Sequence, residues 1–329
     1  MKEVDTITSI ALSFLIILST AFLSANNREV ESKTISISKG MSLNSVINLL
    51  QENNLIVNKN VLKAKILIRG LASKVPTGTF LIEGRVSDVI LIDSIFNKGP
   101  IRLKLTIPEG TSAKKIFESI NLLLKTDHRF DDLITKKNIL NKYNIIGSSL
   151  EGYLFPDTYY FYNDSSPQDI VDTLVSQFWR EFDEKLVNRA NELGLSVHEV
   201  VTLASIIEGE AMLDSERSTI SSVYHNRLKI NMKLQADPTI QYIIEGPPKT
   251  LSLRDLRIKS PYNTYQNYGL PPGPINNPGI QSIKAALYPL ETDYLFFVAQ
   301  GDGSHKFTTN ELDHEAAKRV YKINKRKNK

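Results

Sequence analysis

The chain has 329 residues, of which 41% are hydrophobic and 23% charged, and its formal net charge is +4. These values are typical of a folded protein of about two domains with a sizeable core, and they exclude a disordered, collagenous or long coiled-coil chain. The chain has no cysteine. A disulfide framework, a zinc finger, an iron–sulfur centre and a thiol nucleophile are therefore excluded, although the cellular compartment is not identified by this alone.

An apolar segment without charge covers residues 7–25. Its length matches one bilayer crossing at about 1.5 Å per residue. A cleaved signal peptide is the alternative, but its apolar core is usually about 7 to 15 residues long, and Leu23-Ser24-Ala25 is a poor cleavage site. We predict a short cytoplasmic tail (1–6), a transmembrane anchor (7–25), a linker (26–33) and a large exported part.

Two segments 70 residues apart share a pattern of strand, glycine turn and helix. The strand and turn cover residues 35–42 in the first copy and 105–112 in the second, and apolar residues recur at helical spacing after each. The pattern is consistent with a scaffold unit used twice or with a glycan-binding module of the LysM kind. We predict a small LysM-like α/β region with this repeated unit over residues 34–145.

The composition changes near residue 150. Of the thirteen tyrosines none precedes Tyr143, and eleven lie between Tyr153 and Tyr294. Aromatic rings stack on sugars, but they also fill cores. The overall prediction is an α+β protein whose mixed α+β catalytic domain covers residues 146–315, followed by a basic tail (316–329). A charge run of this kind is usually a solvated tail, so we expect no nucleic-acid partner.

Helical periodicity is clear in the second half. One apolar stripe at steps of four predicts a single helix with Ile170, Leu174, Phe178, Phe182 and Leu186 on its buried face. Further on, Ser196 and Glu199 form a Ser-x-x-Glu capping box that predicts the start of a second helix. The buried face of this second helix is predicted to consist of Val200, Leu203, Ala204, Ile207 and Ala211.

Two acidic residues near the end of this second helix are candidates for acid–base chemistry. At 100° per residue, Glu208 lies about 80° to one side of the buried face and Glu210 about 80° to the other, so they cannot point into one cleft. Asp214 follows Glu210 by four residues. A like charge together with partial burial raises a carboxyl pKa, as a general acid at neutral pH requires. A solvated acidic helix end is the alternative.

The histidines do not indicate a metal site. The string from His198 to Thr202 is one residue short of the zinc-protease motif, because Thr202 stands where the second histidine would be. The other histidines also lack ligand spacing. We predict neither a metal nor a cofactor.

Several polar and Pro/Gly-rich segments complete the second half. A Gln-x-Asp-Pro elbow covers residues 235–238, and a rigid run with tyrosines and an asparagine covers residues 260–275. Residues 293–299 predict a buried strand that a turn at 301–303 joins to residues 306–310 in a hairpin.

Together these segments resemble a known family, the endolytic murein transglycosylases (MltG, YceG-like). The matching motifs occur in the same order over residues 151–310. They are Glu-Gly-Tyr-Leu-Phe-Pro-Asp-Thr-Tyr from Glu151, Ala-Ser-Ile-Ile-Glu-Gly-Glu from Ala204, Asn-Arg-Leu from Asn226, Leu-Gln-Ala-Asp-Pro-Thr from Leu234, Tyr-Asn-Thr-Tyr from Tyr262, Gly-Leu-Pro-Pro-Gly-Pro-Ile from Gly269 and Tyr-Leu-Phe-Phe-Val-Ala from Tyr294.

The resemblance implies a lyase that cuts nascent peptidoglycan strands between N-acetylmuramic acid and N-acetylglucosamine and leaves a 1,6-anhydro muramic end. The family's catalytic glutamate corresponds to the second acid of the Glu-x-Glu pair, here Glu210. Helix geometry alone allows Glu208 equally, and Glu208 is the second choice. Expected substrate-binding residues are Glu151, Asn226, Gln235, Asp237, Tyr262 and Asn263, each of which could instead be a turn or core hydrogen-bonder.

The same resemblance implies partners and a location. We expect the protein to contact peptidoglycan glycan strands, the membrane through a single span, and cell-wall synthases or the elongation machinery. The expected location is the bacterial inner (cytoplasmic) membrane, with the catalytic domain on its extracytoplasmic side. A membrane-anchored peptidoglycan-binding protein without catalytic activity is the alternative.

Overall fold

The computed structural model describes residues 28–125, 137–163, 165–244, 246–247 and 249–327, with side chains to residue 323. The predicted tail and span, residues 1–25, lie outside these ranges. Within them, no helix combines the length and the apolar character needed to cross a membrane. The chain divides into two compact units: unit 1 is Met1–Leu103 with Tyr160–Ser165, and unit 2 is Lys104–Tyr159 with Ser166–Lys329.

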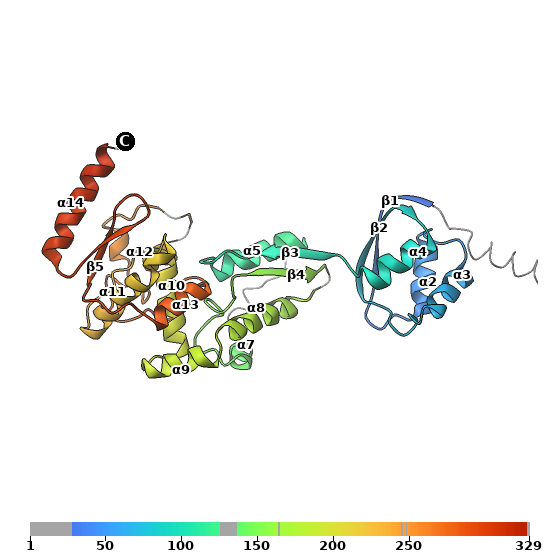
Figure 1. The fold of residues 1–329 in the computed structure, drawn as a ribbon, viewed down its shortest axis with the longest axis horizontal. Helices are drawn as coiled ribbons and strands as arrows, with labels where there is room; N and C mark the ends of the chain where they lie inside the picture. Colours follow the sequence, from blue (N-terminus) through green and yellow to red (C-terminus); the bar gives the residue numbers. More distant parts are fainter. Residues whose placement is uncertain (1–27, 126–136, 164, 245, 248, 328–329) are drawn as a thin grey trace, which may run out of the picture. The chain divides into compact units, whose positions relative to one another are not determined.

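Unit 1 is a two-stranded antiparallel sheet covered by helices (Figure 1). Strands β1 (Arg28–Ile37) and β2 (Gly78–Val86) pair with a register shift between Val30 and Lys33. The helices are α2 (Leu43–Glu52), α3 (Lys59–Ile68) and α4 (Asp88–Ile92), which a π-helical turn (Asp93–Asn97) extends. Because β1 begins at Arg28, it takes up most of the predicted linker, residues 26–33.

The alternation of side chains explains how the sheet of unit 1 meets its helices. Ile35 and Phe80 point inward and are at most 2% exposed, whereas their neighbours Thr34 and Leu81 are exposed. Inward residues of both strands share one core with apolar residues of α2, α3 and α4. A buried ion pair between Lys65 Nζ and Asp88 Oδ2, 2.8 Å long, also joins α3 to α4.

The repeated strand-turn-helix pattern is confirmed. In both copies the turn glycine has a left-handed φ (+81° at Gly40, +73° at Gly110). In both copies a serine then caps the helix, because Ser42 and Ser112 each accept the N–H three residues ahead. The division into units falls at Leu103, between the copies. The LysM-like character of residues 34–145 stays a prediction.

Unit 2 is mostly helical, with two small sheets. β3 (Arg102–Thr106) pairs with β4 (Thr158–Tyr162), and both strands cross the boundary between the units. Its helices within the described residues are α5 (Ala113–Leu124), α7 (Lys137–Lys142), α8 (Pro167–Glu181), α9 (Glu184–Glu192), α10 (Val197–Glu210), α11 (Arg217–Lys229), α12 (Asp237–Ile243), α13 (Ile280–Leu287) and α14 (Glu311–Lys327).

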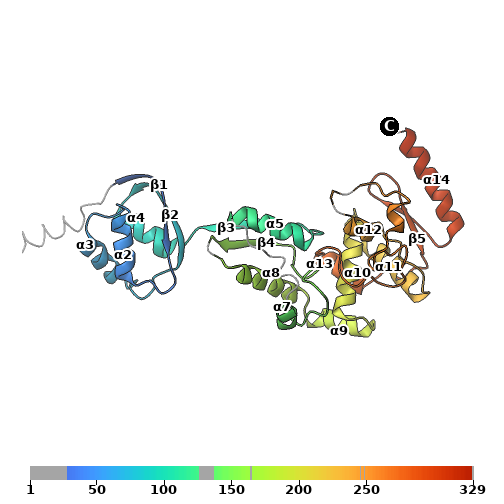
Figure 2. The ribbon, with the colours of Figure 1, turned by 180° about the vertical axis from the view of Figure 1, so that it is seen from behind.

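Helix α10 lies at the centre of unit 2, where it contacts α9, α11, α12 and α13 (Figure 2). Every residue from Val200 to Ile207 is buried. The prediction of one buried face was therefore too narrow, because the loop at residues 275–276 packs on α10 in addition to the four helices. Thr202 and Ser205 are accommodated because their hydroxyls donate to the carbonyls of His198 and Thr202. Ala211 lies one residue beyond the helix and is only half-buried.

The apolar stripe from Ile170 to Leu186 is buried, but the prediction of a single helix was wrong. Helix α8 ends at Glu181, and Phe182 has a non-helical backbone. Asp183 then caps α9 by accepting the N–H of Leu186. A strong N-cap inside the pattern ended the helix, whereas the periodicity of the apolar residues continued through the break.

The predicted hairpin is confirmed as β5 (Phe296–Ala299) paired antiparallel with β6 (His305–Thr308). The first strand begins three residues later than predicted and is half-buried, not buried. Helix α14 packs on both strands. Residues 316–327, predicted as part of a basic tail, continue this helix to Lys327.

The core of unit 2 can be tested at Phe178, which is fully buried beside Tyr153, Trp179 and Phe182. Phe178→Ala is expected to lower the free energy of unfolding by about 3 to 5 kcal/mol, because the cavity left cannot close completely. Trp179, the single tryptophan of the chain, reports urea unfolding of this unit. Leu122→Ala, at a site 82% exposed, is the control and should change it by less than about 0.5 kcal/mol.

Candidate active site

The site is built where the last turn of α10 meets the start of α12. A Cβ on Gly209 would lie 2.6 Å from the Pro238 Cβ, so only glycine allows the two helices to come this close. Asp237, the first residue of α12, is thereby placed beside Glu210, the last residue of α10. Two motifs that are far apart in the sequence form one site.

Glu210 lies in a largely buried position on this contact. Its Oε1 accepts a hydrogen bond from the Tyr224 hydroxyl at 3.0 Å. Burial, followed by the negative charge of Asp237, raises the pKa of Glu210 to about 7, although Tyr224, Arg227 and the Asp237 N–H favour its charged form. A carboxyl with a pKa near 7 can both give and accept a proton at neutral pH.

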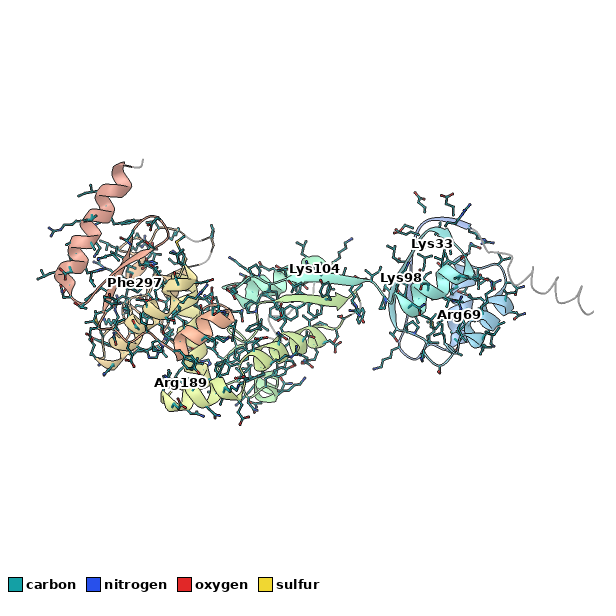
Figure 3. The ribbon with its side chains drawn as sticks, viewed as in Figure 1. Lys33, Arg69, Lys98, Lys104, Arg189 and Phe297 are labelled. Carbon is teal, nitrogen blue, oxygen red and sulfur yellow. The ribbon has the colours of Figure 1, made fainter. Side chains whose placement is uncertain are left out.

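A buried arginine and two tyrosines fix the surroundings of Glu210. Arg227 donates to the carbonyls of Leu234 and Leu295, each at 2.6 Å. The ring of Tyr224 packs edge-on against that of Phe297, with 6.0 Å between the ring centroids (Phe297 is labelled in Figure 3). The Tyr265 hydroxyl donates to Asp237 Oδ1 at 2.5 Å. Tyr224 is thus held in place as part of α11, and Asp237 is held by Tyr265 from the loop that follows α12.

Gln235 lies two residues before Asp237 in an unusual backbone conformation. Its φ is +47°, in the left-handed region that non-glycine residues rarely adopt. The Gln235 N–H donates to the Thr264 carbonyl and the Ala236 N–H to the Thr264 hydroxyl, so these two bonds hold the elbow against the loop at residue 264. The Gln235 side chain is exposed beside Asp237, where it can contact a ligand.

Glu208 points elsewhere and is fully engaged in structural contacts. Its Oε1 lies 3.1 Å from Arg217 Nη1, and its Oε2 accepts the Gly279 N–H at 3.0 Å. Arg217 is itself 8% exposed and also pairs with Asp214 and hydrogen-bonds Ser282. Asp214, expected to act on Glu210, therefore lies with Arg217. This pairing makes Glu208 a clamp between α10, α11 and α13.

Glu151 is buried in a different network. Its Oε1 accepts from the Ala113 N–H at 2.9 Å and from Asn277 Nδ2 at 3.0 Å. Burial raises its pKa to about 7, in spite of these two donors. Burial, followed by the negative charge of Glu151, raises the pKa of both Tyr242 and Tyr262, whose ring centroids lie 5.0 Å apart. Tyr262 is only half-buried and can present its ring to a ligand.

The two predicted asparagines serve the backbone. Asn226 Nδ2 donates to the carbonyls of Thr292 and Tyr294. Asn263 is fully buried, and its Nδ2 donates to the carbonyls of Leu256 and Ile258. The structure thus brings Asp237 to Glu210, leaves Gln235 exposed two residues before Asp237, and places Tyr262 near Glu151. Asn226 and Asn263 shape the loops around them.

Sequence reasoning missed Tyr224, Arg227 and Tyr265 as neighbours of the candidate acid. Arg227 and Tyr265 lie inside the motifs that begin at Asn226 and Tyr262, and Tyr224 lies two residues before the first of these motifs. It also missed Arg217, the cation that engages Glu208. The burial of Arg217 and its pairing with Glu208 depend on tertiary contacts, so no local sequence pattern signals them.

His198 has a packing role. Its Nδ1 bonds the Tyr153 hydroxyl at 3.0 Å, and its Nε2 lies 2.9 Å from the Pro272 carbonyl. Within the described ranges, no group of three acidic or histidine side chains lies close enough to hold a metal ion.

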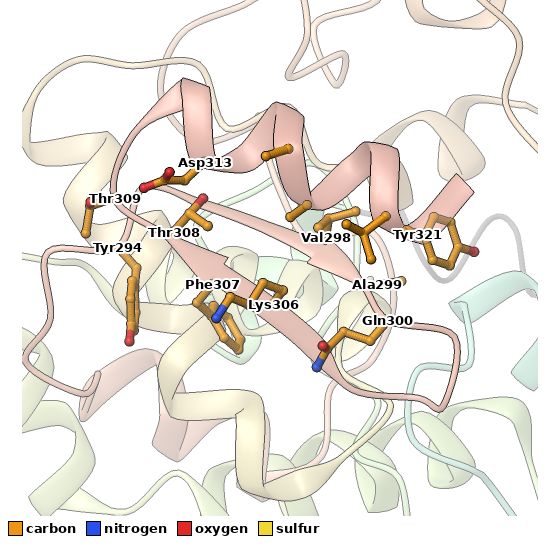
Figure 4. A pocket seen from close by; sticks show the side chains of 13 residues that line it. Tyr294, Val298, Ala299, Gln300, Lys306, Phe307, Thr308, Thr309, Asp313 and Tyr321 are labelled. Carbon is orange, nitrogen blue, oxygen red and sulfur yellow. The ribbon is translucent and has the colours of Figure 1, made fainter. Parts of the chain in front are cut away.

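Unit 2 also contains a pocket of about 670 Å³ between the hairpin β5–β6 and α14 (Figure 4). Tyr294, Phe307 and Tyr321 line it with their rings, and Lys306 and Asp313 add charges of opposite sign. The Thr308 hydroxyl, which is buried among the lining residues, has no hydrogen-bond partner. Glu210 and the predicted ligand-contacting residues do not line this pocket.

The fold and the site together define an α+β protein in which a central helix holds one carboxyl of raised pKa. Comparisons agree with this class. The YceG-like family model matches residues 35–320. The endolytic murein transglycosylase of Bacillus subtilis (strain 168) is 34% identical over 316 residues, 89% of this chain and 86% of that protein. A crystal structure of a YceG-like protein from Listeria monocytogenes has a TM-score of 0.62 at 30% identity and covers 87% of this chain and 98% of that one.

A more distant relative is the endolytic murein transglycosylase of Streptococcus pneumoniae serotype 2 (strain D39). It is 28% identical over 243 residues, which are 66% of this chain and 44% of that protein. The chain belongs to the YceG-like family, as its motifs predicted.

The raised pKa values predict a pH dependence of stability. Both Glu151 and Glu210 titrate near 7 in the folded chain, against 4.5 as ordinary values. The stability that their protonation contributes is fully present below about pH 4.5 and is lost as the pH rises through about 7. Between pH 5 and pH 8 each group should lower the free energy of unfolding by about 2.5 kcal/mol.

Glu210→Gln should remove one of these contributions. The measurement is urea unfolding followed by Trp179 fluorescence at pH 5 and pH 8, with Glu192→Gln at an exposed site as the control. An unchanged pH dependence in Glu210→Gln would contradict the raised pKa.

Proposed function

We propose that this protein is an endolytic peptidoglycan lytic transglycosylase. It cleaves the β-1,4 bond between N-acetylmuramic acid and N-acetylglucosamine of nascent glycan strands, forms a 1,6-anhydro muramic end and so terminates strand elongation. The observation that carries the proposal is the Glu210 carboxyl, with a pKa of about 7 beside Asp237, in a chain related to endolytic murein transglycosylases.

One carboxyl can perform this reaction. Protonated Glu210 gives its proton to the glycosidic oxygen as the bond from that oxygen to the muramic C1 breaks. The resulting carboxylate then takes the proton of the muramic C6 hydroxyl, whose oxygen bonds to C1. Glu210 is protonated again at the end, and no water is consumed, in contrast to ordinary glycoside hydrolysis with two carboxylates.

The neighbours of Glu210 have separate roles in this scheme. The charge of Asp237 raises the pKa of Glu210 and can also stabilise positive charge that develops on the sugar ring. The hydrogen bond from Tyr224 holds the carboxyl in one orientation. Gln235, with its exposed side chain, and Tyr262, with its half-buried ring, contact the sugar. Glu151, Asn226 and Asn263 do not contact the sugar in this scheme; their hydrogen bonds hold the surrounding loops in place.

The wider organisation belongs to the same proposal. Residues 7–25 anchor the chain in the inner membrane, and the described units lie on the extracytoplasmic side. Residues 34–145 hold glycan or space the active domain from the bilayer. In that location, cell-wall synthases that make new strands are the natural partners.

Substituting the two candidate acids one at a time separates their roles. Glu210→Gln should lower the rate of anhydro-product formation by about 10²- to 10⁴-fold, because the acid and base are lost together. Glu208→Gln should act mainly on stability, since it removes the buried carboxylate that pairs with the Arg217 guanidinium. Products are identified by mass spectrometry of peptidoglycan digested with the full chain. Wild-type rates from Glu210→Gln would overturn the assignment, and a wild-type protein that forms no anhydro ends would favour the binding-protein alternative.

The role of Asp237 can be tested through Tyr265, which orients it. Tyr265→Phe removes the 2.5 Å hydrogen bond but keeps the ring. Roughly a tenfold loss of rate is expected, together with a shift of the pH–rate profile, because Asp237 sets the pKa of Glu210. Tyr288→Phe, at a half-exposed site, is the control. A lower rate with an unchanged profile would assign Tyr265 to packing alone.

A further inference from the structure

Helix α3 of unit 1 has an apolar outer face as well as a buried one. Its inner residues Leu62 and Ile66 are at most 2% exposed. In the last turn of the helix, Leu67 is 52% exposed and Ile68 76%, and at the opposite end Val57, just before the helix, is 60% exposed. Exposed apolar residues at both ends of one helix indicate a surface that contacts another body.

The charge around this face has a single sign. Residues 57–76 contain Lys59, Lys63, Lys65, Arg69 and Lys74, and no aspartate or glutamate. Lys65 is buried in its ion pair with Asp88, whereas Lys59, Arg69 and Lys74 are exposed (Arg69 is labelled in Figure 3). Apolar side chains flanked by cations are typical of helices that lie in the interface of a membrane with anionic lipids.

The start of β1 brings the N-terminal end of α3 close to the predicted anchor. The span is predicted to end at residue 25, and β1 begins at Arg28. Three residue steps reach at most about 10 Å. Arg28 Nη1 donates to the Asn54 carbonyl, and Lys33 Nζ donates to the Asn53 carbonyl. Both carbonyls lie in the short connection that leads to Val57 and α3. The chain therefore enters unit 1 beside the start of α3, the end of the helix at which Val57 lies.

We propose that the outer face of α3, formed by Val57, Leu67 and Ile68 with Lys63 and Arg69 beside them, rests on the anionic surface of the bilayer. This proposal depends on the anchor that forms part of the proposed function. A glycan strand is a poorer occupant, because residues 57–76 contain no aromatic ring on which a sugar could stack. Unit 1 would then be held against the membrane by two contacts, the span and this face.

The absence of cysteine makes a site-specific test simple. Ile68→Cys in the full chain carries an environment-sensitive fluorophore, and the protein is reconstituted in vesicles of phosphatidylcholine with phosphatidylglycerol. Glu83→Cys, on the exposed side of β2, is the matched control. We expect a blue shift and quenching by lipids with brominated acyl chains at position 68, and neither at position 83.

A charge-reversed variant provides a second measurement. Lys63→Glu with Arg69→Glu should abolish the quenching at position 68, while the chain still floats with the vesicles. A label at position 68 that matches position 83 in floating protein overturns the proposal, as does protein that does not float at all. A shift caused by glycan strands without lipid, or one that depends on the protein-to-lipid ratio, overturns it in favour of glycan or a second copy. Anhydro-product formation by the same preparations tests the proposed function separately.

Discussion

The close packing of Gly209 against Pro238 is the constraint on which the site depends. A side chain at residue 209 would force α12 away from α10, because its Cβ would lie 2.6 Å from that of Pro238. With α12 in place, Asp237 faces Glu210 and Tyr265 can reach Asp237. The glycine between the two glutamates is thus a packing requirement that has a chemical consequence.

The surroundings of α10 explain why its two acids differ. The whole middle of α10 is buried, and its last turn, with both acids half-buried, lies where this core meets the surface. Glu208 forms an ion pair with Arg217 there, which joins α10 to α11. Glu210 meets a hydroxyl and a like charge, which raises its pKa to about 7. Two carboxyls two residues apart therefore take a structural and a chemical role.

Much of this could be predicted from the sequence, because it depends on local patterns. The capping box at Ser196, the hairpin after Asp293 and the repeated strand-turn-helix unit are each determined by a few neighbouring residues. The opposite directions of Glu208 and Glu210 follow from helix geometry alone. The resemblance of several ordered motifs identified the family.

What could not be predicted depends on tertiary contacts. The burial of α10 requires four helices and a loop whose packing no periodicity reveals. Arg217 lies seven residues after Glu210, and nothing in its spacing shows that it turns back to Glu208. Asn226 and Asn263 looked suited to sugar recognition, yet their amides bond loop carbonyls that are nearby only in the fold. Helix α8 ends inside a continuous apolar pattern, because a cap at Asp183 outweighed the periodicity.

The central claim is that Glu210 exchanges a proton near neutral pH. Carbon-13 NMR of protein labelled at the glutamate side-chain carboxyl measures this directly, with Glu210→Gln used to assign the resonance. The account predicts that the Glu210 carboxyl titrates near pH 7, well above 4.5. Titration of this resonance near pH 4.5 in the folded, active protein would contradict the account.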